Sequence, residues 1–457
     1  MNDNNIEKFD LIVIGGGSGG VRAARIAALH GAKVALCEKD RMGGTCVIRG
    51  CIPKKLLYYS SQYQEYISSS SSYGWLIKDK RYNFNKMIKN KNKELNRLEG
   101  IYQNNLVKAG VKIYKGKASF LNKNRLRINN NFIESKKIII ATGGIPVRLN
   151  IPGAVYSEDS DSIMQLEKLP KSLVIIGGGY IAIEFAFIFA NLGTKVDLIV
   201  RNKILRGFDK DLVEHVHNNL VTKKVNILIK SEVKEIRKNK NNLSIVLKNN
   251  NKIIYSDRVL VAVGRSPNTG GLNLNKINII CNKVNAIKVN KNLATNIKNI
   301  FAIGDVTDRI NLTPVAIAEG HALSDKLFSK IKKTVDLSYI GTAVFSSPPI
   351  CSIGLTEAEA KKIIKKLDVY ESVFNALKYS IVKKKFSTYI KLLVNKNNGY
   401  IVGAHMLGEE APEIIQMIGV AIDAKATMKN FINTMAIHPT VAEEFVTFKE
   451  PTRKNYI

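Results

Sequence analysis

The chain has 457 residues, of which 45% are hydrophobic, and it carries five cysteines and a formal net charge of +32. This length suggests two to four domains with sizeable cores. No apolar run reaches the ~20 residues that a membrane-spanning helix needs, and so few cysteines exclude a disulfide-rich scaffold. Residues 1–10 are polar and mixed in charge, so we expect neither a signal nor a transit peptide and place the protein in the cytoplasm.

The positive charge leaves two alternatives. A surplus of this size could bind nucleic acid or an acidic membrane surface. The lysines, however, come mostly with asparagine in surface-like runs such as 238–242 and 248–252, and no nucleic-acid motif accompanies them. We attribute the charge to a compositional bias and expect no specific nucleic-acid or membrane partner. A positive field would still attract small anionic substrates.

The first predicted element is a short apolar strand over residues 9–14, followed by a helical stretch over 21–29. The turn between them fits G-x-G-x-x-G, a spacing that brings a pyrophosphate against backbone N–H groups and the helix dipole. A second strand over 33–37 ends at Glu38, which is placed to hydrogen-bond a ribose hydroxyl. Together these features predict a dinucleotide site. Its turn residues are Gly15, Gly17, Ser18, Gly19 and Gly20.

Two cysteines follow, Cys46 and Cys51, with Pro53, Lys54 and Lys55 behind them. A disulfide between them would close a short loop worth only about 2 kcal/mol, so stability is a poor reason for it. A ring that opens and closes in a redox cycle is a better one, because Lys54 would lower thiol pKa values. Metal binding is the rival, but no second cysteine pair is present. Two unrelated buried cysteines are the third alternative.

Residues 43–55 resemble the redox-active disulfide of the flavoprotein disulfide reductases, and residues 47–49 between the cysteines most resemble those of glutathione reductases. The resemblance covers nearly the whole chain, with later motifs in the family's order. It implies an α/β fold with two nested Rossmann-like, three-layer domains that bind FAD and NADPH, and an α+β dimerisation domain. The implied domains are FAD-binding, 1–145 and 269–336; NADPH-binding, 146–268; dimerisation, 337–457.

By this resemblance the first glycine motif holds FAD. Residues 141–143 resemble the turn where the chain leaves the FAD domain, residues 259–265 the strand that returns, and residues 299–305 the second FAD motif, whose Asp305 would hold the ribityl chain. The stretch 312–316 would lie near the flavin. The further cofactor contacts implied in this way are Thr45, Lys54, Thr142, Gly264, Arg265, Asp305 and Thr313.

A second strand–turn–helix begins at residue 173 and fits G-x-G-x-x-A, which predicts a second dinucleotide site. Its second strand, 195–200, lacks the acid that recognises the ribose of NAD. Arg201 stands there and Arg206 follows, and arginines suit a 2′-phosphate, so we predict NADPH. The loop between the two arginines is one residue shorter than is usual in the resembling family. The turn residues are Gly177, Gly178, Gly179 and Ile181.

Glu184 follows Tyr180 by four residues, so both lie on one helical face. The resemblance implies that Tyr180 covers the nicotinamide pocket and that Glu184 pairs with Lys54 beside the flavin. The alternative is a core tyrosine and a surface glutamate.

Near the C-terminus, Glu443 follows His438 by five residues. The string from 438 to 445 resembles the family's acid–base pair, although a lone histidine near a C-terminus is usually structural. The resemblance implies that Cys51 faces the flavin and that Cys46 attacks the substrate disulfide. It further implies a homodimer, in which the partner subunit's His438 protonates the leaving thiolate.

The resemblance implies that the substrate is glutathione disulfide and that Ser18, Arg22, Arg25 and Tyr102 line its cleft. Arg22 and Arg25 lie three apart on one helix face and would meet carboxylates. For Tyr102 a plain amphipathic helix is the alternative. The resembling enzymes often carry arginine where this chain has His321.

Three rival functions remain. Dihydrolipoamide dehydrogenases share the scaffold but usually have serine at the position of Lys55 and an acid at that of Arg201. Mercuric reductases add C-terminal cysteines, and none follows Cys351. A basic binding protein with a vestigial reductase fold need not keep the cysteine pair and the histidine, and all three are present.

Overall fold

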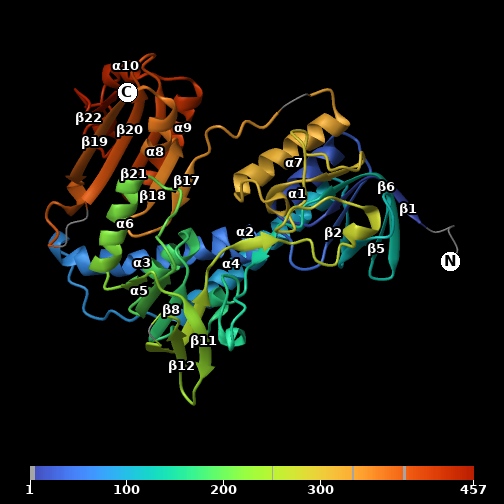
Figure 1. The fold of residues 1–457 in the computed structure, drawn as a ribbon, viewed down its shortest axis with the longest axis horizontal. Helices are drawn as coiled ribbons and strands as arrows, with labels where there is room; N and C mark the ends of the chain where they lie inside the picture. Colours follow the sequence, from blue (N-terminus) through green and yellow to red (C-terminus); the bar gives the residue numbers. More distant parts are fainter. Residues whose placement is uncertain (1–5, 250, 332–333, 384–386, 457) are drawn as a thin grey trace.

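Five β-sheets and ten α-helices organise the chain in the computed structural model, which describes residues 6–249, 251–331, 334–383 and 387–456. The first strands, β1 (Glu7–Ile14) and β2 (Val34–Glu38) in blue, and the C-terminal sheet in orange and red lie in separate parts of the molecule (Figure 1). The green segments of the middle of the chain lie below both. This arrangement is the predicted one: two nucleotide-binding α/β parts and a C-terminal α+β part.

The first sheet has seven strands: β1 (Glu7–Ile14), β2 (Val34–Glu38), β3 (Lys112–Lys115), β4 (Ala118–Phe120), β5 (Arg125–Ile128), β6 (Asn131–Ile140) and β16 (Ile300–Ala302). Their order is β3-β2-β1-β6-β5-β4, with β16 also paired to β6. The pairs among β1, β2, β3, β6 and β16 are parallel. Residues 11–14 and 138–140 of the central strands are apolar and buried, as parallel strands covered on both faces require.

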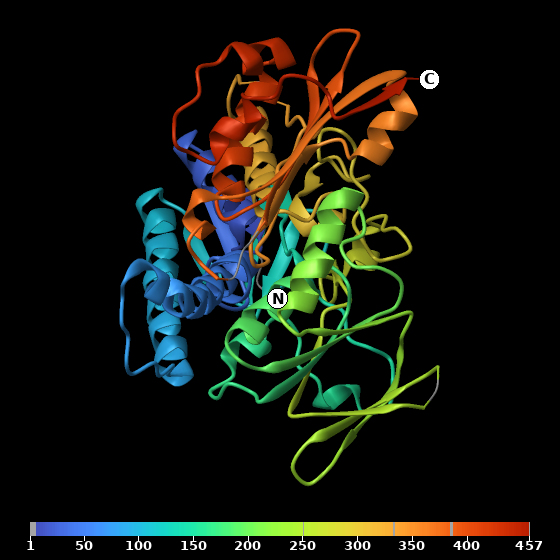
Figure 2. The same cartoon turned by 90° about the vertical axis from the view of Figure 1, so that its left-hand side faces the viewer.

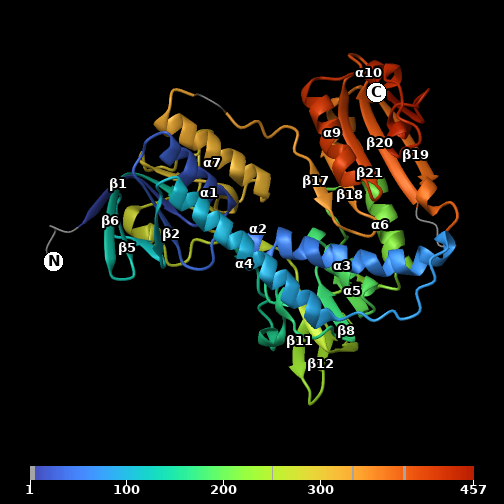
Figure 3. The same cartoon turned by 180° about the vertical axis from the view of Figure 1, so that it is seen from behind.

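Five helices accompany this sheet in the N-terminal segment and at residues 313–328: α1 (Ser18–Leu29), α2 (Gly44–Arg49), α3 (Cys51–Ser69), α4 (Phe84–Lys108) and α7 (Thr313–Phe328). Of these, α3 extends away from the sheet (Figure 3) and packs against α5 (Tyr180–Asn191). Helices α1 and α7 pack side by side because Gly320 allows it: a Cβ there would lie 2.5 Å from the Gly19 carbonyl oxygen. Helix α3 begins directly after α2, so the two cysteines sit on consecutive helices. Seen from behind, α3 and α4 cross the middle of the molecule (Figure 3).

The second sheet contains four parallel strands in the order β10-β9-β8-β14. Helix α5 is hydrophobic nearly all round and nine of its residues are buried, as expected of a helix enclosed in a core. A three-stranded antiparallel sheet extends from this part (Figure 2). The bounds are β8 (Ser172–Ile176), β9 (Lys195–Val200), β10 (Asn226–Ile229), β14 (Arg258–Val261), α5 (Tyr180–Asn191), α6 (Lys210–Thr222), β11 (Val233–Lys238), β12 (Leu243–Leu247) and β13 (Ile253–Ser256).

A two-stranded antiparallel ribbon, β7 (Gly144–Pro146) with β15 (Arg265–Pro267), pairs the segment that follows the first sheet with the segment that follows β14. Residues 144 and 267 are therefore neighbours although 123 positions separate them. The domain boundaries at residues 145, 268 and 336 stay predictions.

The C-terminal part is a six-stranded antiparallel sheet in the order β17-β18-β21-β20-β19-β22 with three helices. One face of the sheet carries α9, whose apolar stripe at residues 411, 415, 418 and 422 is buried. The bounds are β17 (Thr342–Val344), β18 (Ile350–Gly354), β19 (Lys366–Asn375), β20 (Ser387–Asn395), β21 (Ile401–Leu407), β22 (Arg453–Tyr456), α8 (Glu357–Ile363), α9 (Ala411–Asp423) and α10 (Met428–Asn433).

Candidate functional site

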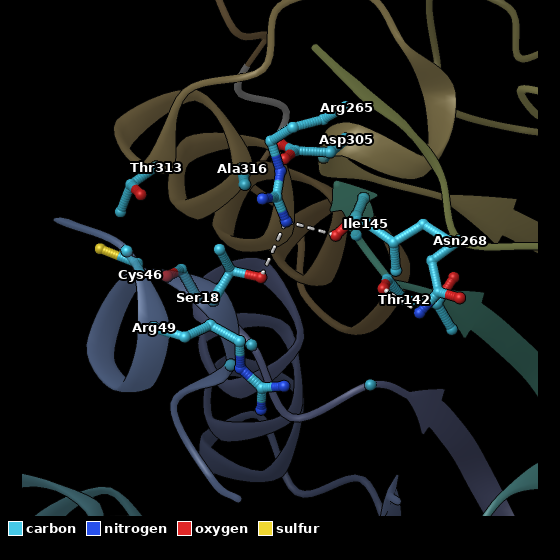
Figure 4. A pocket seen from close by; sticks show the side chains of 18 of the residues that line it. Ser18, Cys46, Arg49, Thr142, Ile145, Arg265, Asn268, Asp305, Thr313 and Ala316 are labelled. Carbon is cyan, nitrogen blue, oxygen red and sulfur yellow. Dashed lines mark hydrogen bonds between the residues drawn. The ribbon is translucent and has the colours of Figure 1, made fainter. Parts of the chain in front are cut away.

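A cavity of about 570 Å3 lies where the first sheet, the cysteine helices and α5 meet. Residues from the first glycine turn, from both cysteine helices and from the start of α7 line it. Figure 4 shows their side chains converging on one space. The cavity brings together these predicted residues: Gly15, Gly17, Ser18, Gly19, Glu38, Thr45, Cys46, Cys51, Lys54, Thr142, Tyr180, Ile181, Glu184, Arg265, Asp305 and Thr313.

The first glycine turn connects β1 to α1 as predicted. Gly15 has φ of +111°, and a Cβ there would lie 2.3 Å from the carbonyl oxygen of Ala141, so only glycine fits. The Glu38 carboxylate accepts hydrogen bonds from the backbone N–H groups of Gly16, at 2.6 Å, and of Asp40, at 2.8 Å. These bonds fix the carboxylate at the carboxyl edge of the sheet, where a ribose would meet it.

The two cysteines face each other across the junction of α2 and α3. Both are free thiols in the structure, and their side chains share a hydrogen bond. That bond lowers the pKa of Cys51 to about 6, with help from Thr313 and Lys54 and against burial. The same bond, together with burial, raises the pKa of Cys46. The pair therefore shares one proton near neutral pH, with the thiolate on Cys51.

Lys54 and Glu184 form the predicted ion pair, with 2.6 Å between Nζ and Oε1. Glu184 also accepts the backbone N–H of Phe345 at 3.0 Å, and the Phe345 ring centroid lies 4.2 Å from Lys54 Nζ. Tyr180, one helical turn before Glu184, lines the same wall, and burial raises its pKa to about 12. The predicted alternative of a surface glutamate is wrong, because Glu184 is buried.

Arg265 crosses the cavity from β15 and donates to Thr45 Oγ1 at 3.3 Å and to the Gly144 carbonyl (Figure 4). Asp305 lies close to it; burial raises the pKa of Asp305 and the Arg265 charge opposes that shift. Two buried polar atoms of this cavity, Thr142 Oγ1 and Arg265 Nε, have no hydrogen-bond partner among the described residues. Buried groups of this kind call for a ligand. Gly264, just before β15, has φ of +133°.

The second glycine turn joins β8 to α5. Gly177 has φ of +141°, and a Cβ there would lie 2.3 Å from the carbonyl oxygen of Ala262. Gly179 is the N-cap of α5 and no side chain caps this helix end, so its N–H groups are open to an anion. At the end of β9, Arg201 and Arg206 are exposed.

The predicted substrate residues come from α1 and α4, and Ser18 is the one that lines the cavity with Cys46. Ser18 and Cys46 share a hydrogen bond. Burial first, and then Cys46, raise the pKa of Tyr102, while Arg22 and Arg25 lower it. Ser18 and Tyr102 therefore lie near that thiol, and Arg22 and Arg25 lie near Tyr102. Arg25 Nε is buried and has no hydrogen-bond partner in the part of the chain that the structure describes.

His438 and Glu443 form the predicted pair, with 3.0 Å between Nδ1 and Oε2. The His438 side chain is 81% exposed, and neither residue lines the cavity that holds the cysteines. The structure of one chain therefore does not bring this pair to the disulfide. His321, in place of an arginine, lies on α7 with Nε2 at 3.6 Å from Asp325 Oδ2.

Sequence reasoning missed several cavity residues, among them Arg49, Ser160, Asp161 and Phe345. Arg49 lies four residues after Thr45, on the same face of α2, so the helical period could have identified it. The other three residues come to the cavity from segments distant in sequence, so no local pattern predicts them.

Within the described ranges, no helix is long and apolar enough to cross a membrane. The same residues contain no metal-binding group of three or more His, Cys, Asp or Glu side chains.

Comparison with known proteins gives concordant results. The sequence pattern of the pyridine nucleotide-disulphide oxidoreductases matches residues 9–320, and that of their dimerisation domain matches residues 340–448. The glutathione reductase of Burkholderia cepacia is 43% identical over 96% of this chain and 98% of its own length. The trypanothione reductase of Trypanosoma congolense is 35% identical over 97% and 96%.

One solved structure shares the whole fold. The HOCl-induced flavoprotein disulfide reductase RclA from Escherichia coli has a TM-score of 0.86 and 28% sequence identity, covering 95% of this chain and 98% of its own. This likeness confirms the predicted fold class.

Proposed function

Because this chain belongs to the pyridine nucleotide-disulphide oxidoreductase family, we propose that it is an enzyme that reduces glutathione disulfide to two molecules of glutathione, with NADPH as reductant and FAD as bound cofactor. The observation that carries the proposal is the cysteine pair on the cavity wall, one thiol with a lowered pKa and a buried lysine beside it. Chains that carry the name glutathione reductase and match 96–98% of this chain support the substrate.

The residues of the cavity fit FAD. The unpartnered Thr142 hydroxyl and Arg265 Nε offer hydrogen bonds inside the cavity, and the uncapped N-terminus of α1 offers N–H groups to a pyrophosphate. Glu38 and Asp305 would hold the ribose and the ribityl chain. When bound, FAD supplies a two-electron carrier between the nicotinamide and the cysteine pair.

The second glycine turn is proposed to bind NADPH, with its pyrophosphate at Gly177–Gly179 and its 2′-phosphate at Arg201 and Arg206. The arginines favour the phosphate because guanidinium groups bind it through two parallel hydrogen bonds. Tyr180 would cover the nicotinamide pocket. The Lys54–Glu184 pair would hold a positive charge beside the flavin ring.

The reduced cysteine pair would then transfer two electrons to the substrate. Cys46 loses its proton to His438 of the partner subunit and attacks one sulfur of the substrate disulfide. The substrate S–S bond breaks, a Cys46–glutathione disulfide forms, and the partner's His438 returns the proton to the departing thiolate. Cys51 next attacks the Cys46 sulfur, which restores the Cys46–Cys51 disulfide and releases the second glutathione.

The protein is proposed to act as a homodimer. The match to the family's dimerisation domain supports this. So do the exposed apolar residues near the His438 segment, because such clusters mark protein interfaces: Met417, Val420, Ile432, Met435 and Ile437. We also place the protein in the cytoplasm, since five cysteines in 457 residues are too few for a disulfide-rich scaffold and fit a reducing compartment.

Steady-state kinetics test the proposal directly. NADPH and NADH are each combined with glutathione disulfide, lipoamide and trypanothione disulfide. We expect the highest kcat/KM for NADPH with glutathione disulfide, because Arg22 and Arg25 face an anionic peptide. Higher turnover of lipoamide with NADH would assign the chain to the dihydrolipoamide dehydrogenases, and higher turnover of trypanothione disulfide would assign it to the trypanothione reductases.

A further inference from the structure

Arg49 occupies an unusual place, between the two cysteines in the chain. It is the last residue of α2, the helix that carries Cys46, and only Gly50 separates it from Cys51. Figure 4 shows its side chain near Ser18, with the guanidinium group pointing away from Cys46. It lines the cavity together with Thr45, one helical turn earlier.

The surroundings of Arg49 leave most of its hydrogen-bonding capacity unused. Its side chain is 28% exposed and forms an ion pair with Asp40, whose side chain is 45% exposed. An ion pair this exposed contributes little to stability. A guanidinium group has five N–H donors, and the described residues show one of them, on Nη2, bound to Asp40.

Carboxylates line the cavity close to Arg49. Glu38, Asp40 and Asp161 all line it, and burial raises the pKa of Asp161 while Arg265 and then Arg49 act against that shift. A pyrophosphate would add two negative charges next to these carboxylates. The N-terminus of α1 offers only about half a positive charge, and Lys54 is already paired with Glu184. Lys39, Lys55 and Lys117 also line the cavity, but a guanidinium group can bind an anion through two parallel hydrogen bonds, which an ammonium group cannot.

We propose that Arg49 binds the pyrophosphate of FAD, with Asp40 as its partner when the cofactor is absent. The inference rests on the proposed FAD site and adds a side-chain cation to it. It also connects cofactor binding to the redox ring, because the same short helix carries Arg49 and Cys46. A bound pyrophosphate would hold α2 in place on the side away from the thiols.

The test is FAD affinity rather than activity. Apoprotein is titrated with FAD by calorimetry at several salt concentrations, for the wild type and for Arg49→Gln, Arg49→Lys and Asp40→Asn. Loss of a charge-assisted hydrogen bond predicts a dissociation constant about ten- to a hundredfold higher for Arg49→Gln, with a weaker salt dependence. Arg49→Lys should restore part of the affinity. Asp40→Asn should leave affinity unchanged or raise it, since it frees the guanidinium group.

The outcomes distinguish a failure of the proposed role of Arg49 from a failure of the proposed FAD site. If wild-type apoprotein binds FAD and Arg49→Gln binds it equally well, Arg49 has no role and the proposed function stands. If Asp40→Asn weakens FAD binding as much as Arg49→Gln, the ion pair matters only for folding of the loop and the inference is wrong. If wild-type apoprotein binds no FAD, the proposed function itself fails, and the inference fails with it. Equal far-ultraviolet circular dichroism of all variants excludes misfolding.

Discussion

The Nζ of Lys54 lies 2.6 Å from Oε1 of Glu184, and this ion pair joins α3, beside the cysteines, to α5, at the second nucleotide site. The Glu184 side chain is 3% exposed and that of Lys54 12%. Removing one partner of a buried pair leaves the other charge uncompensated.

We therefore expect Glu184→Gln to lower the free energy of unfolding by about 3–5 kcal/mol, measured by urea denaturation. The double variant Lys54→Met with Glu184→Gln should recover most of that loss but no activity. Glu94→Gln is the matched control, because its pair with Arg97 is exposed and solvent screening leaves it little effect on stability. An equal loss in the single and double variants would show that the pair itself is unimportant.

The shared proton of the cysteines gives a second prediction. In the reduced protein, alkylation by iodoacetamide should follow a thiol pKa of about 6, the value at Cys51. In Cys46→Ser the hydroxyl replaces a thiol as hydrogen-bond partner, and in Cys51→Ser the remaining Cys46 has no thiolate beside it. Both single variants should therefore show a changed pH profile of alkylation. A profile that stays the same in both would mean that the two thiols titrate independently.

How far the sequence could predict this molecule depends on how local each feature is. Both glycine turns follow from the chain itself, since Gly15 and Gly177 adopt positive φ at strand–helix junctions that the apolar pattern already marks. That Phe345 and Asp161 line the cavity could not be predicted, because both residues belong to segments distant in the sequence from the cysteines. Lys391 is the clearest case.

Lys391 reads as an ordinary strand lysine in β20, yet its side chain is 1% exposed. Helices α6 and α8 cover it with carboxylates: Nζ lies 2.9 Å from Asp209 Oδ1, 2.7 Å from Asp211 Oδ2 and 2.7 Å from Glu357 Oε2. The cluster forms only because the second nucleotide-binding part packs against the C-terminal sheet. The residue pattern of β20 alone therefore cannot predict that Lys391 is buried and ion-paired.

The Lys391 cluster predicts a dependence of stability on pH. Burial alone would raise the pKa of Glu357, but its bonds to Lys361, Lys391 and Arg453 outweigh burial and lower it to about 2 from 4.5. A lowered carboxyl pKa stabilises the fold above its ordinary value and loses that contribution as pH falls. The stability of the wild type against thermal unfolding should therefore decrease as the pH falls from 4.5 to about 2, the range set by the two pKa values of Glu357.

The variant Lys391→Met should distinguish the contribution of this cluster to the pH dependence of stability from the contributions of other carboxyl groups. Near pH 7 the variant should be less stable by about 3–5 kcal/mol, because the carboxylates lose a buried cation. The difference from wild type should shrink as pH falls, since the wild type loses its advantage and protonation relieves the repulsion in the variant. Calorimetric scans at several pH values measure this, and a difference that stays constant down to about pH 3 would contradict it.

Coenzyme choice should depend on the exposed arginines after β9. Arg201→Glu should lower kcat/KM for NADPH by about ten- to a hundredfold, because one charge-assisted bond to the 2′-phosphate contributes roughly 1.5–3 kcal/mol. The value for NADH should stay the same or rise. Lys195→Glu, at the opposite end of the same strand, makes the same change of charge and should leave the preference unaltered. Equal kcat/KM of the wild type for NADPH and NADH would contradict recognition of the 2′-phosphate by these arginines.

The position of His438 predicts an active site shared between two chains. Its pair with Glu443 lies after α10 in the C-terminal part, and α10 stands far from α2 in the views of Figures 1 and 3. A two-fold dimer makes any such sharing reciprocal, so each dimer would hold two identical composite sites. Cys46→Ser and His438→Gln should each be nearly inactive alone.

A complementation experiment tests whether the active site is shared between two chains. When the two inactive variants are unfolded and refolded together in equal amounts, roughly half of the dimers should be mixed. Each mixed dimer has one site with both functional residues and one site with neither, so about a quarter of wild-type activity should return. If the site lay within one chain, every site would carry a lesion and no activity would return. Differently tagged chains allow mixed dimers to be isolated, and mixed dimers without activity would reject the shared site.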